Sequence, residues 1–185
     1  MELLTPLWLP ILLSAVVVWI VATMAWAVLP HHKQDFIGLP DENGFIEYLR
    51  RSGIQSGNYL FPDFRDPQVM RSERIDKVMK EGPVGHLNLW PTPVSMGSKM
   101  VATFFVYLAV SILIAYLTRV AIPGPAPFLQ VFQVAATAGI LAYCFSSIPS
   151  AIWFGSYKRT IVATLIDGVI YGAIIGAIFG WRWPH

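Results

Sequence analysis

Residues 167–181 read DGVIYGAIIGAIFGW, and this stretch decides how the chain folds. Glycine recurs at every fourth position of a run otherwise built mainly from apolar residues, giving Gly168, Gly172, Gly176 and Gly180. Residues four apart share one face of an α-helix, and rows of small residues let a second helix approach closely within a membrane. The stretch therefore predicts a membrane-spanning helix with one face shaped for close packing.

The rest of the chain has the same apolar character. Of its 185 residues, 55% are hydrophobic and 13% are charged, whereas a soluble domain usually carries about 25% charged residues. A spanning helix needs about 20 mostly apolar residues, because lipid cannot hydrogen-bond an exposed backbone. Four windows qualify, at about 7–29, 99–118, 128–152 and 160–180. We predict an all-α transmembrane protein with a four-helix membrane bundle.

The windows divide the chain into three parts. We assign 1–29 to the first transmembrane helix, 30–98 to an extramembrane cap, and 99–185 to the other three helices. The first window has no basic region before it, and Pro30-His31-His32-Lys33 follows it in place of a cleavage site. We therefore interpret it as a retained helix and not as a signal peptide.

Turn and helix signals give the cap a small α+β pattern. A helical pattern begins at Pro40-Asp41 and stops at Gly53, and an apolar run with turn residues at both ends predicts a strand over 57–62. A second helix follows Asp66-Pro67 and stops at Gly82-Pro83, before a second predicted strand over 84–90.

Basic residues next to the spans predict the orientation. The cap side carries Lys33, Lys99, Lys158 and Arg159, and the opposite side carries only Arg119 and Arg182. Because positive charges are retained on the cytoplasmic side, we expect a multi-pass protein of the cell (cytoplasmic) membrane, with the cap in the cytoplasm and both termini outside.

Two partners for the glycine row follow from the sequence. The third window offers matching small residues at Ala135, Ala138, Gly139, Ala142 and Ser146. We favour packing of the third helix against the fourth over a homo-oligomer formed through the glycine face. A glycine-lined pore has less support.

Asp167 is the one ionisable residue well inside a predicted span. It lies roughly 10 Å from the cytoplasmic end of its helix, where an unpaired charge costs several kcal/mol. Matching the depths of the helices predicts Tyr143, Ser146 and Tyr107 as neighbours, and none of them is basic. We favour a structural carboxyl group bonded to Ser and Tyr hydroxyls, with a proton or cation transport site as the alternative.

A second group of polar residues follows the first span in LPHHKQDF (29–36). His31, His32 and Asp35, joined by His86 from the second predicted strand, are candidate ligands for zinc or a similar metal. Adjacent histidines do not easily face one ion together, however, and the chain has no His pair at i,i+4 and no CxxC. We favour an interfacial cluster that reaches toward the lipid headgroups.

Several function classes lack their signatures. GxSxG, Walker, GxGxxG and HExxH motifs are absent, and the net charge of +2 without a basic stripe argues against nucleic acid as a partner. We predict no catalytic residues and no cofactor. The cap has side chains suited to protein contact at Arg50, Arg51, Tyr59, Phe61, Phe64 and Arg65.

The favoured function is therefore a non-catalytic accessory or interaction protein. Its expected partners are the lipid bilayer and either another protein or a second copy of this chain. One alternative is a small proton- or cation-coupled transporter using Asp167. The other is a metal-dependent membrane enzyme using His31, His32, Asp35 and His86.

The segments LPHHKQDF and GPVGHLNLWP (82–91) carry a resemblance to known sequences. The chain resembles a group of uncharacterised bacterial membrane proteins with one span, a cap that opens with LPHHK-x-D, and three further spans. The resemblance implies a bacterial cytoplasmic-membrane location and no particular activity.

Overall fold

The computed structural model describes residues 4–63 and 65–184, most of which are helical. These residues form two units. One comprises Ile37–Ser95, and the other combines the chain up to Phe36 with the chain from Met96 onward. The division places the helical bundle and the inserted cap in separate units.

Four long helices make up the first unit. They cover Thr5–Ala27, Met96–Ala121, Phe128–Trp153 and Lys158–Arg182, and each is long and apolar enough to cross a membrane. The first combines a 3-10 turn, η1 (Thr5–Leu7), with α1 (Trp8–Ala27), while the second and fourth are α5 (Met96–Ala121) and α8 (Lys158–Arg182). The length and composition of these helices are those of a multi-pass membrane protein.

The third long helix is interrupted. It consists of α6 (Phe128–Ile140), a π-helical turn η3 (Leu141–Phe145) and α7 (Ile148–Trp153). Pro149 lies in the first turn of α7. Because proline has no N–H and its ring clashes with the carbonyl group four residues earlier, regular helix cannot continue from Phe145 into α7. The expected window 128–152 is therefore a single apolar stretch divided into three pieces.

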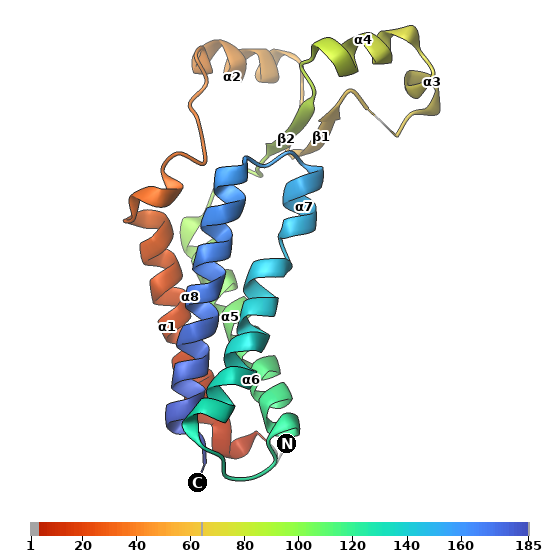
Figure 1. Cartoon of the computed structure of the whole chain (residues 1–185). Helices are drawn as coiled ribbons and strands as arrows, with labels where there is room; N and C mark the ends of the chain where they lie inside the picture. Colours follow the sequence, from red (N-terminus) through yellow and green to blue (C-terminus); the bar gives the residue numbers. More distant parts are fainter. Residues whose placement is uncertain (1–3, 64, 185) are drawn as a thin grey trace. The chain divides into compact units, whose positions relative to one another are not determined.

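The long helices lie side by side, and α1 begins at the same end of the unit at which α8 ends (Figure 1). α1 packs against α5 and α8, and α6 packs against α8 and α5. Their shared core includes Leu7, Val18, Ile114, Val131, Ile175 and Phe179, all 2% exposed or less. The Trp183 indole N–H donates to the Gly124 carbonyl at 3.0 Å, which ties the end of α8 to the loop between α5 and α6.

The four glycines of α8 are buried and face α6 and η3. A Cβ atom added at Gly172 would lie 2.8 Å from the backbone nitrogen of Ile140 and 2.9 Å from the carbonyl oxygen of Ala136. A Cβ atom added at Gly139 would lie 2.8 Å from the Cα atom of Gly172. The backbones of α6 and α8 thus approach each other more closely than a side chain allows.

The surface that meets the glycines differs from the expected set of small residues. The nearest atoms belong to Phe128, Phe132, Ala136, Ile140, Tyr143 and Cys144, and of the expected set only Gly139 makes such a contact. Ala135 is instead buried in the core, and Ser146 is exposed. Since α6 covers the glycine row, a second copy of the chain would reach the row only by displacing α6.

The second unit pairs two strands and adds short helices. Its elements are α2 (Glu42–Arg51), β1 (Gly57–Phe61), α3 (Pro67–Met70), α4 (Glu73–Glu81) and β2 (Gly85–Leu89). The Asp41 carboxylate caps α2 by accepting from the Gly44 N–H at 3.0 Å. The strands are antiparallel, with Gly57 opposite Leu89 and Phe61 opposite Gly85. One expected helix is thus two, and Phe64, expected at a contact surface, lies outside the described residues.

The close approach of α6 and α8 predicts the effect of one added methyl group. We expect Gly172→Ala to lower the free energy of unfolding by about 1–3 kcal/mol, because the new Cβ atom overlaps backbone atoms of α6. Gly97→Ala in α5, where nothing lies within 4 Å of the added atom, is the matched control and should be neutral or slightly stabilising. Thermal unfolding of both variants in the same detergent measures the difference. Equal stability of the two variants would contradict the packing.

Candidate functional site

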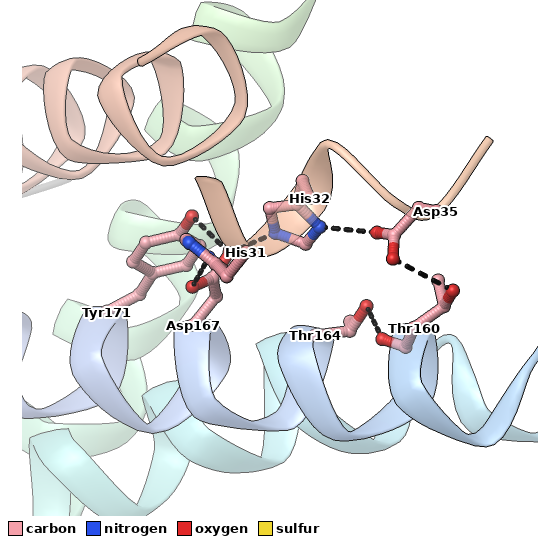
Figure 2. Close-up of polar contacts among 7 residues, drawn as sticks. All are labelled: His31, His32, Asp35, Thr160, Thr164, Asp167 and Tyr171. Atoms are coloured by element: carbon pink, nitrogen blue, oxygen red, sulfur yellow. Dashed lines mark hydrogen bonds and ion pairs between the residues drawn. The ribbon is translucent and has the colours of Figure 1, made fainter. Parts of the chain in front are cut away.

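A tight turn after α1 brings polar side chains to α8. The turn η2 (Pro30–His32) is closed by the Lys33 N–H, which donates to the Pro30 carbonyl at 3.2 Å. The Asp35 N–H then donates to the His32 carbonyl at 3.0 Å, so the chain continues to curl. Figure 2 shows that this turn carries His31, His32 and Asp35 over the surface of α8.

The facing surface of α8 is a polar stripe on an apolar helix. Thr160, Thr164, Asp167 and Tyr171 follow one another at intervals of four, three and four residues, which places them on one helix face (Figure 2). The Thr164 hydroxyl donates to the carbonyl oxygen of Thr160 at 2.9 Å, within α8. The hydroxyl groups of Thr160 and Tyr171 instead donate hydrogen bonds to the carboxylates of Asp35 and Asp167, respectively.

Asp167 lies at the centre of this site. Nε2 of His31 is 3.1 Å from its Oδ1 atom, and Nε2 of His32 is 2.9 Å from its Oδ2 atom. The Tyr171 hydroxyl also donates to Oδ2, at 3.4 Å. The Asp167 and His32 side chains are 8% and 2% exposed, but the His31 side chain is 33% exposed. The carboxylate is therefore buried and paired, with one of its partners open to the surroundings.

His32 bridges two carboxylates. Its Nδ1 atom is 2.6 Å from Oδ2 of Asp35, whose Oδ1 accepts from the Thr160 hydroxyl at 3.1 Å. Trp26 of α1 stacks on the imidazole, with ring centroids 3.9 Å apart and planes within 4° of parallel. A neutral imidazole has only one N–H, and carboxylates only accept. Contact with two carboxylates therefore calls for a proton on each ring nitrogen, a protonated carboxyl group, or a metal ion at Nε2.

Electrostatic interactions favour the charged forms of both His32 and Asp35. Burial disfavours the imidazolium form of His32, but hydrogen bonds to Asp167 and Asp35 and their negative charges outweigh it, so the pKa of His32 lies above its ordinary value. Burial would also raise the pKa of Asp35. Hydrogen bonds from His32 and Thr160, with the charges of His32 and Arg159, lower that pKa below its ordinary value instead.

The expected neighbours of Asp167 were wrong in one respect. Its hydrogen-bond partners are His31, His32 and Tyr171, and not Tyr143, Tyr107 or Ser146. The reason is helix rotation, because Gly168 faces Tyr143 and Cys144 of η3 and successive residues of a helix differ by about 100°. Asp167 therefore points to a different side of α8, toward the turn after α1. The i,i+4 spacing from Asp167 to Tyr171 was the signal available in the sequence.

The two other tyrosines extend inward from Tyr171. Tyr143 meets Tyr171 edge-on with ring centroids 5.6 Å apart, and Tyr107 lies 5.8 Å from Tyr143. Among the described residues, the buried Tyr143 hydroxyl has no hydrogen-bond partner. These rings pack behind the polar stripe without joining its hydrogen bonds.

The two adjacent histidines face one common group, the carboxylate of Asp167. Their rings are tilted by 44°, with centroids 4.3 Å apart, and both Nε2 atoms face Asp167 (Figure 2). A 3-10 turn separates successive side chains by about 120°, but imidazoles are long enough to converge on one group beside the turn. His86 lies on β2, in the other unit.

The geometry matches that of a metal site. His31, His32 and Asp167 each offer one ligand atom, and these atoms lie within 4.8 Å of one another. A tetrahedral zinc ion with bonds of 2.0–2.1 Å separates neighbouring ligand atoms by roughly 3.3 Å. The two nitrogen–oxygen distances, 3.1 Å to Oδ1 and 2.9 Å to Oδ2 of Asp167, run to different oxygens of the carboxylate, so either oxygen has one imidazole within that range. Asp35 faces the other nitrogen of His32, and metal-binding histidines almost always donate that N–H to such a group.

A groove borders the site between α1 and α8. Its volume is about 430 Å³, and its walls include His31, Asp167, Tyr171 and Arg159. The other lining residues are apolar: Val21, Ala25 and Leu29 precede the turn, and Val162, Ala163, Ile166 and Ile170 belong to α8. The more exposed histidine thus lies where the polar site and an apolar surface meet.

No family model, curated protein or solved structure matches this chain. Function is therefore inferred from the side chains themselves.

Unequal burial of the two histidines predicts unequal effects on stability. When a chelator keeps the protein free of metal, we expect His32→Gln to lower the free energy of unfolding by about 3–5 kcal/mol, because the substitution leaves two buried carboxylates without their shared partner. His31→Gln, at the partly exposed position, should cost about 1 kcal/mol. Denaturant unfolding in one detergent compares the two variants. A larger loss for His31→Gln would contradict the arrangement.

Proposed function

We propose that this multi-pass membrane protein binds a divalent ion of the zinc class through His31, His32 and Asp167. One observation carries the proposal: imidazoles from the turn and a carboxylate 135 residues away in sequence converge with their donor atoms at ligand spacing. The proposal joins the carboxylate of the transport hypothesis to the histidines of the metal hypothesis. In the proposed ligand set Asp167 takes the place of His86. Asp35 is no longer a ligand and instead contacts the Nδ1 atom of His32.

Charge supports a dication at this place. With both imidazoles neutral, Asp167 and Asp35 together carry a charge of −2 in a buried setting, which is costly without compensation. A divalent ion neutralises them, whereas a proton on His32 compensates one of the two. Imidazole nitrogen and carboxylate oxygen also suit zinc and its neighbours in the first transition row.

Three protein ligands are typical of zinc sites that act on a ligand and do not serve structure alone. Such sites keep a fourth position for water or substrate, and here the groove borders His31 and Asp167. When bound, an ion of this kind polarises a carbonyl or phosphoryl oxygen and acidifies bound water. This chain's own residues orient the site: Asp35 and Trp26 fix the ring of His32, and Tyr171 bonds to Asp167. The accessory and transport roles stay predictions.

Metal content tests the proposal. Protein purified in mild detergent without chelator, then supplied with zinc, should hold about one ion per chain by elemental analysis. His32→Ala and Asp167→Asn should abolish most of this binding, and His86→Ala is the matched control that should retain it.

Cobalt adds a second readout, because tetrahedral nitrogen and oxygen ligation produces a characteristic visible absorption. Folded wild-type protein that takes up neither zinc nor cobalt would refute the metal site. Full binding by Asp167→Asn would refute the ligand set.

We also propose that the protein resides in a bacterial cytoplasmic membrane, with the cap in the cytoplasm and both termini outside. Four basic residues support this orientation, since Lys33, Lys99, Lys158 and Arg159 flank the helix ends next to the cap and the turn before α8. The polar site would then lie near the cytoplasmic surface.

Fusion reporters test the orientation. Alkaline phosphatase fused to the C-terminus should be active and a fluorescent protein fused there should be dark, because both reporters would lie outside. The same reporters inserted in the cap, after Gly53, should give the opposite result. Fluorescence from the C-terminal fusion would reverse the proposed topology.

A further inference from the structure

We infer that the groove between α1 and α8 binds an anionic phospholipid, with one acyl chain along its apolar wall and the phosphate near Arg159 and His31. The location and the lining of the groove are the observations that support binding of a lipid. The preference for a negative headgroup rests in part on the metal centre proposed above.

The apolar wall has the dimensions of one lipid leaflet. Arg159 and Tyr171 both line the groove, and twelve residues of helix span about 18 Å. The hydrocarbon of one leaflet is about 15 Å thick, half of the membrane core. Val162, Ile166 and Ile170 stand on one side of α8 at successive intervals of four residues and are about half-exposed. An acyl chain covers such a wall along its length.

The charge at the mouth of the groove selects the headgroup. Arg159 lies in the first turn of α8, and among the described residues it forms no ion pair within 4 Å. A divalent ion would cancel the charges of Asp167 and Asp35, which leaves the +1 of Arg159 uncompensated. A phosphodiester with net negative charge supplies the missing −1, whereas a zwitterionic lipid does not.

Depth and exposure are consistent with this pose. Arg159 precedes Asp167 by eight residues, about 12 Å along the helix, so the guanidinium lies closer to the membrane surface than the carboxylate. His31 is the exposed partner of Asp167, so its ring is the part of the polar site that a headgroup reaches first.

Native mass spectrometry of the full-length protein tests the inference. We expect retention of phosphatidylglycerol over phosphatidylcholine when both are added at equal concentration. Arg159→Gln should weaken phosphatidylglycerol binding roughly fivefold, the effect of one basic side chain at a lipid surface, and Arg159→Lys should restore most of it. Ile166→Trp should block the groove, while Val169→Trp, exposed on the same helix but outside the groove, is the matched control.

Zinc content measured on the same samples separates the two proposals. Equal retention of both lipids, or full retention by Ile166→Trp, overturns the lipid inference whether or not zinc is present. Selective binding lost in Ile166→Trp and Arg159→Gln supports it. If that pattern occurs in protein that binds no zinc, only the metal centre fails, and the selectivity is then due to Arg159.

Discussion

A carboxylate placed inside an apolar helix has to be paired, and the pairing of Asp167 with His31 and His32 determines how the first helix of the bundle leaves the membrane. Without these partners, burial of the charge would cost several kcal/mol. The chain after α1 therefore does not run outward at once. It first turns back against α8, where Asp35 and Thr160 complete the hydrogen bonds of the buried imidazole.

α8 meets two different demands on two of its faces. The glycine row lies against α6, where the absence of side chains allows backbone contact. The polar stripe includes Asp167, which directly precedes the first glycine of that row, and it faces the turn after α1, because a single step along a helix rotates the side chain by about 100°. Close packing on one face holds α8 in a fixed rotation, and this rotation directs Asp167 toward the histidines and away from Tyr143 of η3 and Tyr107 of α5.

Apolar composition is enough to predict the four long helices, because hydrocarbon solvation leaves few alternatives to a helix. The two strands of the inserted segment are predicted separately, from short apolar runs bounded by turn residues. The rotation of each helix was not predictable in this way. Depth matching predicts Tyr143 and Ser146 beside Asp167, but the hydrogen-bond partners of the carboxylate are His31, His32 and Tyr171. The histidines were missed as partners because their approach depends on a single 3-10 turn, a feature that neither hydropathy nor spacing encodes. Pro149 was the visible signal for the interruption of the third helix.

The two imidazoles of the turn differ in burial, and they would therefore contribute differently if the site binds an ion as we propose. The imidazole of His32 is buried under Trp26 and contacts Asp35 and Asp167 through its two nitrogens, so it contributes mainly to the stability of the site. His31 lines the groove, so an ion that reaches or leaves Asp167 under the proposed metal binding would pass that ring. In that case the exposed imidazole would bear mainly on the exchange rate of the ion, and the buried imidazole mainly on the stability of the site.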